Sequence, residues 1–305
     1  SSHPDGYAIG PSMTSAELVD TSAELVIAIE KGGLFTRFVE EQVDKKFKSI
    51  IINTGGQAPR STRTLLKRLH DEMGLPVVIL TDGDVYGEHI AMVIKSGSAN
   101  AAHLKGLTVP DAKWMGVWAT DIDKFKLPTI PMTESDIKRC YDLLKDPRYQ
   151  EGLWKRELEV FIKIKRKAEL EAFSKYGLNN ITEKYLPKKL EESKIEIKGE
   201  GTYEGLRLLF NDLICIQSSD NYIEVHYYSG KDIKKSLIRN KLSFIADEFP
   251  ELLRTHRSYI INPYHFQQWK TERGKLYIEL SSSIFVPVSN TYKDEVKSIL
   301  NSATA

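Results

Sequence analysis

Short apolar runs alternate with amphipathic segments through the first two thirds of the chain. The apolar runs are typical of strands buried on both faces, and they are ELVIAIE (24–30), SIIINT (49–54), PVVILTD (76–82) and KWMGVWA (113–119). The segments between them repeat apolar residues at helical spacing, and they are FTRFVEEQVDKKF (35–47), STRTLLKRLHDEM (61–73) and YGEHIAMVIKSG (86–97). This alternation predicts an α/β unit built on a parallel sheet.

A helical region follows the last of these runs. Thr133 and Asp136 in TESD have the spacing of a capping box, which predicts that a helix starts there. The segment GLWKRELEVFIKIKRKAELEAFSKYG (152–177) predicts one long charged helix that ends at Gly177. Its charges are most simply interpreted as a solvated helix face.

The pattern changes near LEESKIEIKGEG (190–201), where the helical spacing stops. Short runs rich in Ile, Tyr and Val follow, and they are LICIQ (213–217), NYIEVHYY (221–228), DIKKSLIR (232–239), SYIIN (258–262), KLYIEL (275–280) and IFVPVS (284–289). The stretch 222–239 predicts a hairpin that turns at Ser229 to Asp232. We therefore expect two domains, residues 1–193 and 194–305, of which the second is mainly β.

Composition narrows the classes of protein that this chain can belong to. Hydrophobic residues make up 41% of its 305 residues, and no apolar run reaches the ~18 residues of a membrane span. The two cysteines, Cys140 and Cys215, are too few for a disulfide framework or a thiolate metal site, so we expect a cytoplasmic protein. The net charge is +1, and the residues from Lys194 onward carry 15 Lys and Arg against 14 Asp and Glu. Any DNA binding must therefore come from local basic patches.

Three carboxylates follow two of the predicted strands. Glu30 ends the first strand, and Asp82 ends the third, with Asp84 just beyond it. The carboxyl ends of parallel strands share one edge of a sheet, so the three side chains should converge there and could bind Mg²⁺ beside a phosphate. Gly83 would let the backbone turn between the two aspartates. The alternative is that Asp82 caps the next helix, Asp84 is solvated, and Glu30 pairs with Lys31 or Arg60.

The first domain resembles a known family. The segments VIAIEKGGLFTRFVEE, INTGGQAPRSTRTLLKRLH, LTDGDVYGEHIAMVIKSGSANAAHL and DAKWMGVWATDIDKFKLP are similar to the toprim domain of the A subunit of archaeal DNA topoisomerase VI. The resemblance covers residues 5–192, and it implies that Glu30, Asp82 and Asp84 bind Mg²⁺. Val85 stands where relatives usually carry proline. The resemblance also implies a homodimer, a partner ATPase of the B type, and duplex DNA as substrate.

The same resemblance bears on catalysis. In that family the nucleophilic tyrosine belongs to a winged-helix module N-terminal to the toprim domain, and we expect that module to be absent from this chain. No catalytic residue is therefore assigned here, and the chain alone is expected not to cleave DNA. Tyr86 lies next to the carboxylates, but an aromatic residue that opens a helix beside a turn is more often a packing residue.

Basic and aromatic residues are interleaved in the second domain. Arg254, His256 and Arg257 lie just before an apolar strand in LLRTHRSYIINPYHFQQWK, and arginines of this kind can contact bases or phosphates. The alternative is a surface loop whose arginines pair with Glu248 or Glu251.

Residues 195–300 resemble a LytTR DNA-binding domain, a mainly β fold whose loops enter successive major grooves. This resemblance implies DNA contacts at three places along the chain. The residues that match the DNA-contacting loops are Asn221, Tyr222, Arg254, Arg257, Ser289, Asn290 and Lys293. The chain as a whole thus looks like a fusion of two domains. Either it is an artificial fusion of a topoisomerase fragment, or it is a natural regulator whose toprim part is a dimerising or metal-sensing scaffold.

Overall fold

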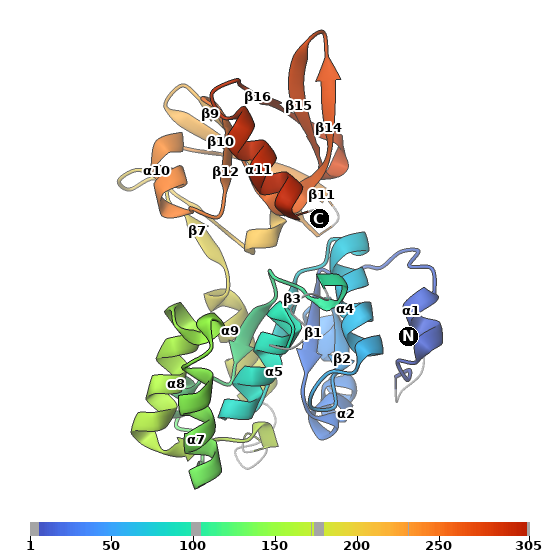
Figure 1. Cartoon of the computed structure of the whole chain (residues 1–305), viewed down its shortest axis with the longest axis vertical. Coiled ribbons are helices and arrows are strands. Elements are labelled where there is room, and N and C mark those ends of the chain that lie inside the picture. Colours follow the sequence, from blue (N-terminus) through green and yellow to red (C-terminus); the bar gives the residue numbers. More distant parts are fainter. Residues whose placement is uncertain (1–5, 99–104, 172, 174–179, 231, 304–305) are drawn as a thin grey trace. The chain divides into compact units, whose positions relative to one another are not determined.

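The computed structural model describes residues 6–98, 105–171, 173, 180–230 and 232–303 (Figure 1). The chain divides into two compact units, Ser1–Ser193 and Lys194–Ala305. Each unit has its own hydrophobic clusters. Within the described residues, no helix combines the length and the apolar character needed to cross a membrane.

A four-stranded parallel sheet forms the centre of the first unit, as the alternation of strands and helices predicts. Its strands are β1 (Leu25–Ile29), β2 (Ser49–Asn53), β3 (Val77–Leu80) and β4 (Lys113–Gly116), in the order β2-β1-β3-β4. The order places β1 beside β3, so the segments that follow these two strands leave the sheet at neighbouring positions.

Helices and short strands complete this unit. The helices are α1 (Pro11–Ser15), α2 (Gly32–Glu40), α3 (Val43–Lys46), α4 (Arg60–Met73), α5 (Val85–Ser96), η2 (Lys105–Leu107), α6 (Ala119–Lys124), α7 (Glu134–Leu143), η3 (Pro147–Tyr149), α8 (Gly152–Ile164), η5 (Asn180–Tyr185) and α9 (Leu186–Glu192). A two-stranded ribbon pairs β5 (Ile130–Pro131) with β6 (Arg166–Lys167). The predicted capping box is confirmed at α7, where the Asp136 N–H donates to Thr133 Oγ1 (3.1 Å) and the Thr133 N–H donates to Asp136 Oδ2 (2.8 Å).

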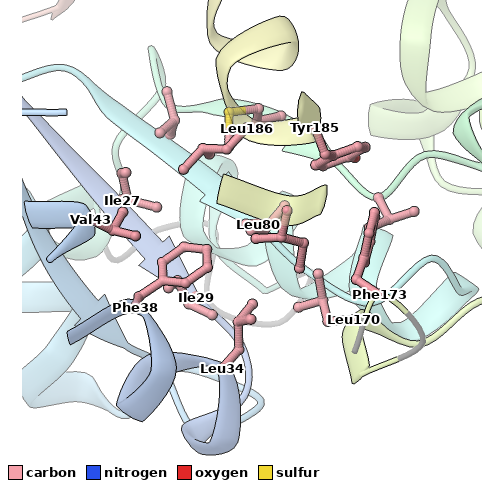
Figure 2. Close-up of a cluster of buried hydrophobic side chains, with 14 of the residues drawn as sticks. Ile27, Ile29, Leu34, Phe38, Val43, Leu80, Leu170, Phe173, Tyr185 and Leu186 are labelled. Carbon is pink, nitrogen blue, oxygen red and sulfur yellow. The ribbon is translucent and has the colours of Figure 1, made fainter. Parts of the chain in front are cut away.

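The central sheet is covered on both faces. Ile27, Ile29 and Leu80 point to the side where α2, η5 and α9 pack together with Leu170 and Phe173, and Figure 2 shows these side chains in one buried cluster. Val26 and Ile79 point to the other side, where α4 and α5 pack. Because alternate residues of each strand are buried in opposite directions, the strands read as continuous apolar runs.

Two predicted helices are wrong in extent. The helix expected over 35–47 is divided into α2 and α3, because Gln42 adopts a left-handed conformation with φ 55°. The long helix expected over 152–177 ends at Ile164, after which Lys165 has φ 51° and the chain enters β6. The predicted end at Gly177 lies outside the described residues. The backbone after Lys165 pairs with other segments of the unit, and these pairings replace the helical hydrogen bonds that the local pattern favours.

The second unit is mainly β, as predicted. A five-stranded antiparallel sheet has the order β11-β10-β9-β13-β12, and a three-stranded sheet has the order β14-β15-β16. The strands are β7 (Ile195–Ile197), β8 (Leu206–Leu208), β9 (Leu213–Ser219), β10 (Tyr222–Ser229), β11 (Asp232–Ile238), β12 (Leu253–His256), β13 (Tyr259–Ile261), β14 (Phe266–Glu272), β15 (Lys275–Leu280) and β16 (Ile284–Val288). The helices are η6 (Phe210–Asp212), α10 (Leu242–Glu248), η7 (Pro263–His265), η8 (Ser281–Ser283) and α11 (Lys293–Ala303).

Both faces of the five-stranded sheet contribute to a core. Ile216 and Val225 belong to a cluster with α10 and the β7–β8 hairpin, whereas Cys215 and Ile261 belong to a cluster with the three-stranded sheet and α11. The predicted hairpin is confirmed, since β10 pairs with β11 up to Ser229 opposite Asp232.

Candidate metal and DNA sites

The three predicted carboxylates lie at the carboxyl edge of the parallel sheet. Glu30 follows β1, and its Oε2 accepts a hydrogen bond from the backbone N–H of Asp82 (2.9 Å) beyond β3. Asp84 is the N-cap of α5, and its Oδ1 accepts from the N–H of Gly87 (2.7 Å). We call Glu30, Asp82 and Asp84 the carboxylate site.

The carboxylates do not have the partners that the alternative interpretation of the sequence gave them, in which Asp82 caps the helix and Glu30 pairs with a basic residue. Asp84, and not Asp82, caps the helix, and burial leaves Asp84 only partly in contact with solvent. Lys31 pairs with Asp82, and not with Glu30, at 3.0 Å between Nζ and Oδ2. Tyr86, for which the sequence favours packing, is 44% exposed.

A segment distant in sequence crosses the site. We call residues 166–171 the strap. Gly83 and Ala168 form an antiparallel bridge, in which Gly83 N–H donates to Ala168 O (2.7 Å) and Ala168 N–H donates to Gly83 O (3.0 Å). The N–H of Leu170 donates to Asp82 Oδ1 (2.6 Å), and the Leu170 side chain packs in the cluster that Figure 2 shows with Leu80. The strap therefore binds Asp82 through its backbone and the sheet through its side chain.

The strap explains why glycine follows Asp82. Gly83 does not have the left-handed φ that a sharp turn was expected to require. A Cβ at this position would instead lie 3.1 Å from the carbonyl oxygen of Ala168 and 2.9 Å from a methyl group of Val117. Gly87 is more restricted, because a Cβ there would lie 2.3 Å from the carbonyl oxygen of Asp82. Close backbone approach, and not turn conformation, selects glycine at both positions.

The carboxylate site concentrates negative charge in a partly dry place. The pKa of Glu30 is raised to about 7, chiefly by burial and also by the charges of Asp82 and Asp84, whereas the hydrogen bond from Asp82 N–H and the charge of Lys31 act to lower it. Burial also raises the pKa of Asp84, against the hydrogen bond from Gly87 N–H. Both pKa values are raised, which means that the negative charges of Glu30 and Asp84 are less well stabilised in the folded chain than in water. A bound cation would stabilise them.

The residues of this site suit Mg²⁺ by their donor chemistry. Carboxylate oxygens are the ligands that Mg²⁺ prefers, and the raised pKa of Glu30 and of Asp84 means that a proton or a nearby cation would offset their charge. In the part of the chain that the structure describes, however, no group of three or more His, Cys, Asp or Glu side chains is arranged closely enough to bind a metal ion. Both oxygens of Asp82 have partners within the chain, the N–H of Leu170 and the ammonium of Lys31.

In the second unit, three loops that carry the predicted DNA-contacting residues lie at one end of the five-stranded sheet. The N–H of Ser218, before the β9–β10 turn, donates to the carbonyl oxygen of Ser258 in the β12–β13 turn (2.9 Å). The N–H of Ser289, after β16, donates to the carbonyl oxygen of Thr255 in β12 (2.9 Å). Long-range pairing thus brings together loops that are far apart in sequence.

The predicted side chains in these loops differ in exposure. Asn221, Arg257 and Asn290 are exposed, and Tyr222 is 40% exposed. Ser289 and Lys293 are half-buried. We call the β9–β10 turn, the β12–β13 turn and the β16–α11 loop the loop end. It presents exposed residues from all three segments.

Two predicted contacts are held inside the loop end. The guanidinium of Arg254 donates through Nη2 to the carbonyl oxygen of Arg257 (2.9 Å), and it lies 5.9 Å from the ring centroid of Tyr292. His256 Nδ1 accepts from the N–H of Ser258 (3.1 Å). These two side chains shape the β12–β13 turn from which Arg257 projects.

Some residues near both sites are not selected by the sequence pattern. The pattern suggests Lys31 only as a partner of Glu30, and it assigns the strap to a helix. Arg239 lies at the end of β11 next to Tyr222, and it is 5.0 Å from the ring centroid of Tyr203 and 3.7 Å from Glu200. The sequence could have indicated Arg239 as a candidate, because it is an arginine at the end of a predicted hairpin strand. No local sequence pattern indicates that the strap crosses the carboxylate site.

Comparisons with known proteins confirm both resemblances. The sequence model described as the toprim domain of the topoisomerase 6 A subunit and Spo11 matches residues 25–190, and that of the LytTr DNA-binding domain matches residues 204–301. Among solved structures, the LytTr DNA-binding domain of a putative methyl-accepting/DNA response regulator from Bacillus cereus covers 35% of this chain and 96% of its own, with 18% identity and a TM-score of 0.29.

The first unit has curated relatives among the A subunits of type 2 DNA topoisomerase 6. The A subunit of type 2 DNA topoisomerase 6 from Methanothermobacter thermautotrophicus is 49% identical over 187 residues, which are 61% of this chain and 53% of that protein. The corresponding protein of Archaeoglobus fulgidus is 44% identical over 188 residues, which are 61% of this chain and 52% of that protein. The chain therefore spans about half the length of the curated relatives it matches.

Proposed function

Because the chain belongs to the toprim family of the topoisomerase 6 A subunit and Spo11, we propose that its first unit supplies the Mg²⁺-binding part of a type IIB DNA topoisomerase. The observation that supports this proposal is that Glu30, Asp82 and Asp84 all follow strands at one edge of the sheet, where the pKa of Glu30 is raised to about 7. Such a site attracts a divalent cation and, through it, a phosphate of DNA.

Glu30, Asp82 and Asp84 would hold the metal. Mg²⁺ bound there would supply positive charge for the scissile phosphate and for the leaving 3′-oxygen. The chain's own groups orient the carboxylates. The Asp82 N–H fixes Glu30, the Leu170 N–H fixes Asp82, and the Gly87 N–H fixes Asp84. Each carboxylate is thus held by a backbone donor, which limits its movement.

Substitution of Asp82 tests the metal site. We expect the intact chain to bind Mg²⁺ with a dissociation constant on the order of millimolar, as for a site of few carboxylates. At about ten times that concentration, Mg²⁺ should stabilise the first unit by about 1.4 kcal/mol, and Asp82→Asn should abolish the gain. Urea denaturation with and without Mg²⁺, followed by tryptophan fluorescence, measures this difference.

The matched control is Asp123→Asn. Asp123 is an exposed aspartate of α6 that pairs only with Lys126 among the described residues, at 3.0 Å. This variant should keep the full stabilisation by Mg²⁺. If Asp82→Asn retained as much stabilisation as Asp123→Asn, the assignment of the carboxylate site to Mg²⁺ would be wrong.

The proposed reaction needs groups from other modules. In this proposal a winged-helix module supplies the nucleophilic tyrosine, and a B-type subunit hydrolyses ATP. Two copies of the toprim unit form a homodimer. This chain, incubated alone with duplex DNA and Mg²⁺, should then form no covalent 5′-phosphotyrosyl adduct. Mass spectrometry of nuclease-treated protein detects such an adduct, and its presence on Tyr86 or another tyrosine would contradict the assignment. Sedimentation equilibrium tests the dimer.

The second unit supports a separate function, the recognition of specific duplex DNA without chemistry. The observation in its favour is the loop end, where exposed Asn221, Arg257 and Asn290 lie on three neighbouring segments. In this alternative the chain is a transcriptional regulator, and the toprim unit serves as a scaffold that dimerises it. Selection of duplexes from a random library, with Mg²⁺ and with chelator, separates the two functions. A motif recovered in both conditions favours the regulator.

A further inference from the structure

Lys31 places a cation at the carboxylate site. The residue follows Glu30 and is the N-cap of α2, so its side chain lies outside the regular helix. Its Nζ is 3.0 Å from Asp82 Oδ2 and 3.9 Å from Glu169 Oε2 on the strap. The side chain of Asp82 is only 7% exposed, whereas that of Lys31 is 29% exposed. The ion pair is therefore buried on the Asp82 side and open on the Lys31 side.

The other oxygen of Asp82 is not free to replace the one that Lys31 occupies. Asp82 Oδ1 accepts the hydrogen bond from Leu170 N–H at 2.6 Å. Leu170 is itself fixed, because its side chain is buried within the hydrophobic cluster of Figure 2 and the strap is paired to Gly83. Of the two oxygens of Asp82, Oδ1 is thus paired with a fixed backbone donor, whereas Oδ2 is paired with a side chain that is partly exposed and can move.

We propose that Lys31 and Mg²⁺ compete for Oδ2 of Asp82, so that the metal binds by displacing the lysine ammonium from this oxygen. The inference rests on the proposed function, since it concerns the same metal site. The exchange changes no covalent bond. One ammonium leaves the carboxylate, and one divalent ion takes its position. Lys31 can move because it is partly exposed, whereas the strap cannot move without exposing Leu170.

Competition lowers the affinity of the site for the metal. Lys31 is present at a fixed, high local concentration, so Mg²⁺ must exceed the strength of the ion pair before it binds. The consequence is a site that fills only at high Mg²⁺ concentration or when a DNA phosphate adds a further ligand. Removal of the ammonium should therefore strengthen Mg²⁺ binding and not weaken it.

The test compares two lysines of the same region. Lys31→Met keeps the apolar stem and removes the competing charge, and we expect it to tighten Mg²⁺ binding roughly tenfold relative to the unchanged chain. Lys167→Met is the matched control. Lys167 is also near the site, where its charge acts on Asp84, but it pairs with Asp136 at 2.8 Å and not with Asp82. Calorimetric titration of the full chain with MgCl₂ gives each affinity.

The outcomes separate competition from other roles. Tightening by Lys31→Met that clearly exceeds that of Lys167→Met supports competition. Equal tightening by both variants would mean a general effect of charge and would overturn the proposal, as would unchanged or weaker binding by Lys31→Met. If neither the unchanged chain nor Lys31→Met bound Mg²⁺, the proposed metal site would fail together with this inference. The three results are therefore distinct.

A second measurement does not depend on any variant. Displacement should expose the Lys31 amine, so acetylation of Lys31 by acetic anhydride should increase several-fold as Mg²⁺ is added. The rate at Lys167 should stay constant, because its partner Asp136 is not a ligand. Peptide mass spectrometry of the full chain reports both lysines in one sample. Protection of Lys31 under conditions where Mg²⁺ binds would contradict displacement.

Discussion

Glu88 is a carboxylic acid buried in the first unit without compensation. It lies on α5 with 0% exposure, and among the described residues neither of its carboxyl oxygens has a hydrogen-bond partner. Burial raises the pKa of Glu88 well above its ordinary value of 4.5, and the charge of Glu157 raises it further. The folded chain therefore holds a proton on Glu88 more tightly than the unfolded chain does. The contribution of Glu88 to stability must fall as pH rises above about 4.5.

Replacement of Glu88 should stabilise the chain in a pH-dependent way. We expect Glu88→Leu to raise the free energy of unfolding of the first unit by about 1–3 kcal/mol at pH 8, because an unpaired buried polar group is removed. The gain should be smaller at pH 5, where the unfolded chain also begins to protonate this group. Urea denaturation at both pH values measures it. Glu159→Leu, at an exposed position of α8, should show no such dependence.

At the scale of elements, the loop end brings together three segments that are far apart in sequence. The β9–β10 turn and the β12–β13 turn meet through Ser218 and Ser258, and the segment after β16 meets β12 through Ser289 and Thr255. Arg254 is used to shape the β12–β13 turn, so Arg257 is the arginine of that turn that projects into solvent. Arg254 is thus used within the turn, whereas the side chain of Arg257 is left exposed.

Arg257 should therefore contribute most to DNA selectivity in this turn. Once a preferred duplex has been selected, Arg257→Ala should weaken binding to it by about 1–3 kcal/mol if the side chain contacts a base. Fluorescence anisotropy at one fixed salt concentration gives the affinities for preferred and unrelated duplexes. Lys234→Ala removes a comparable charge from the half of β11 that lies away from the loop end, and it should change the affinity for DNA little. An equal loss on every duplex would identify a phosphate contact instead.

The whole molecule consists of two units with separate cores. The clusters of the first unit contain residues up to Leu190, and those of the second unit begin at Ile195. Units with separate cores unfold separately when few stabilising contacts join them. Trp114, Trp118 and Trp154 lie in the first unit, and Trp269 lies in the second. The tryptophans can therefore report the two units independently.

We expect two unfolding transitions in the intact chain. Mg²⁺ should shift only the transition of the first unit, and a selected DNA duplex should shift only that of the second, since each ligand stabilises the unit that binds it. Trp269→Phe leaves fluorescence from the first unit alone and assigns the transitions. A single transition that both ligands shift equally would show that the units are thermodynamically coupled.

Many of the strands and both families of this protein could be predicted from its amino-acid sequence. Strands buried on both faces require continuous apolar runs, and helices that cover them require helical spacing, so β1 to β4 and the helices α4 and α5 were predictable from local pattern. The positions of Glu30, Asp82 and Asp84 were also predictable, because parallel strands must end at a common edge. The β10–β11 hairpin followed from its turn residues for the same local reason.

The surroundings of those carboxylates depend on long-range contacts that local pattern does not contain. The helical spacing of residues 152–177 continues past Lys165, but the backbone of the strap bonds to Gly83 and Asp82, which lie far away in sequence. Similarly, sequence could not assign Lys31 to Asp82 in preference to its neighbour Glu30, because the choice depends on where β3 ends beside β1. Local pattern records the period of burial, whereas long-range hydrogen bonds and ion pairs depend on the position of segments that the pattern does not encode.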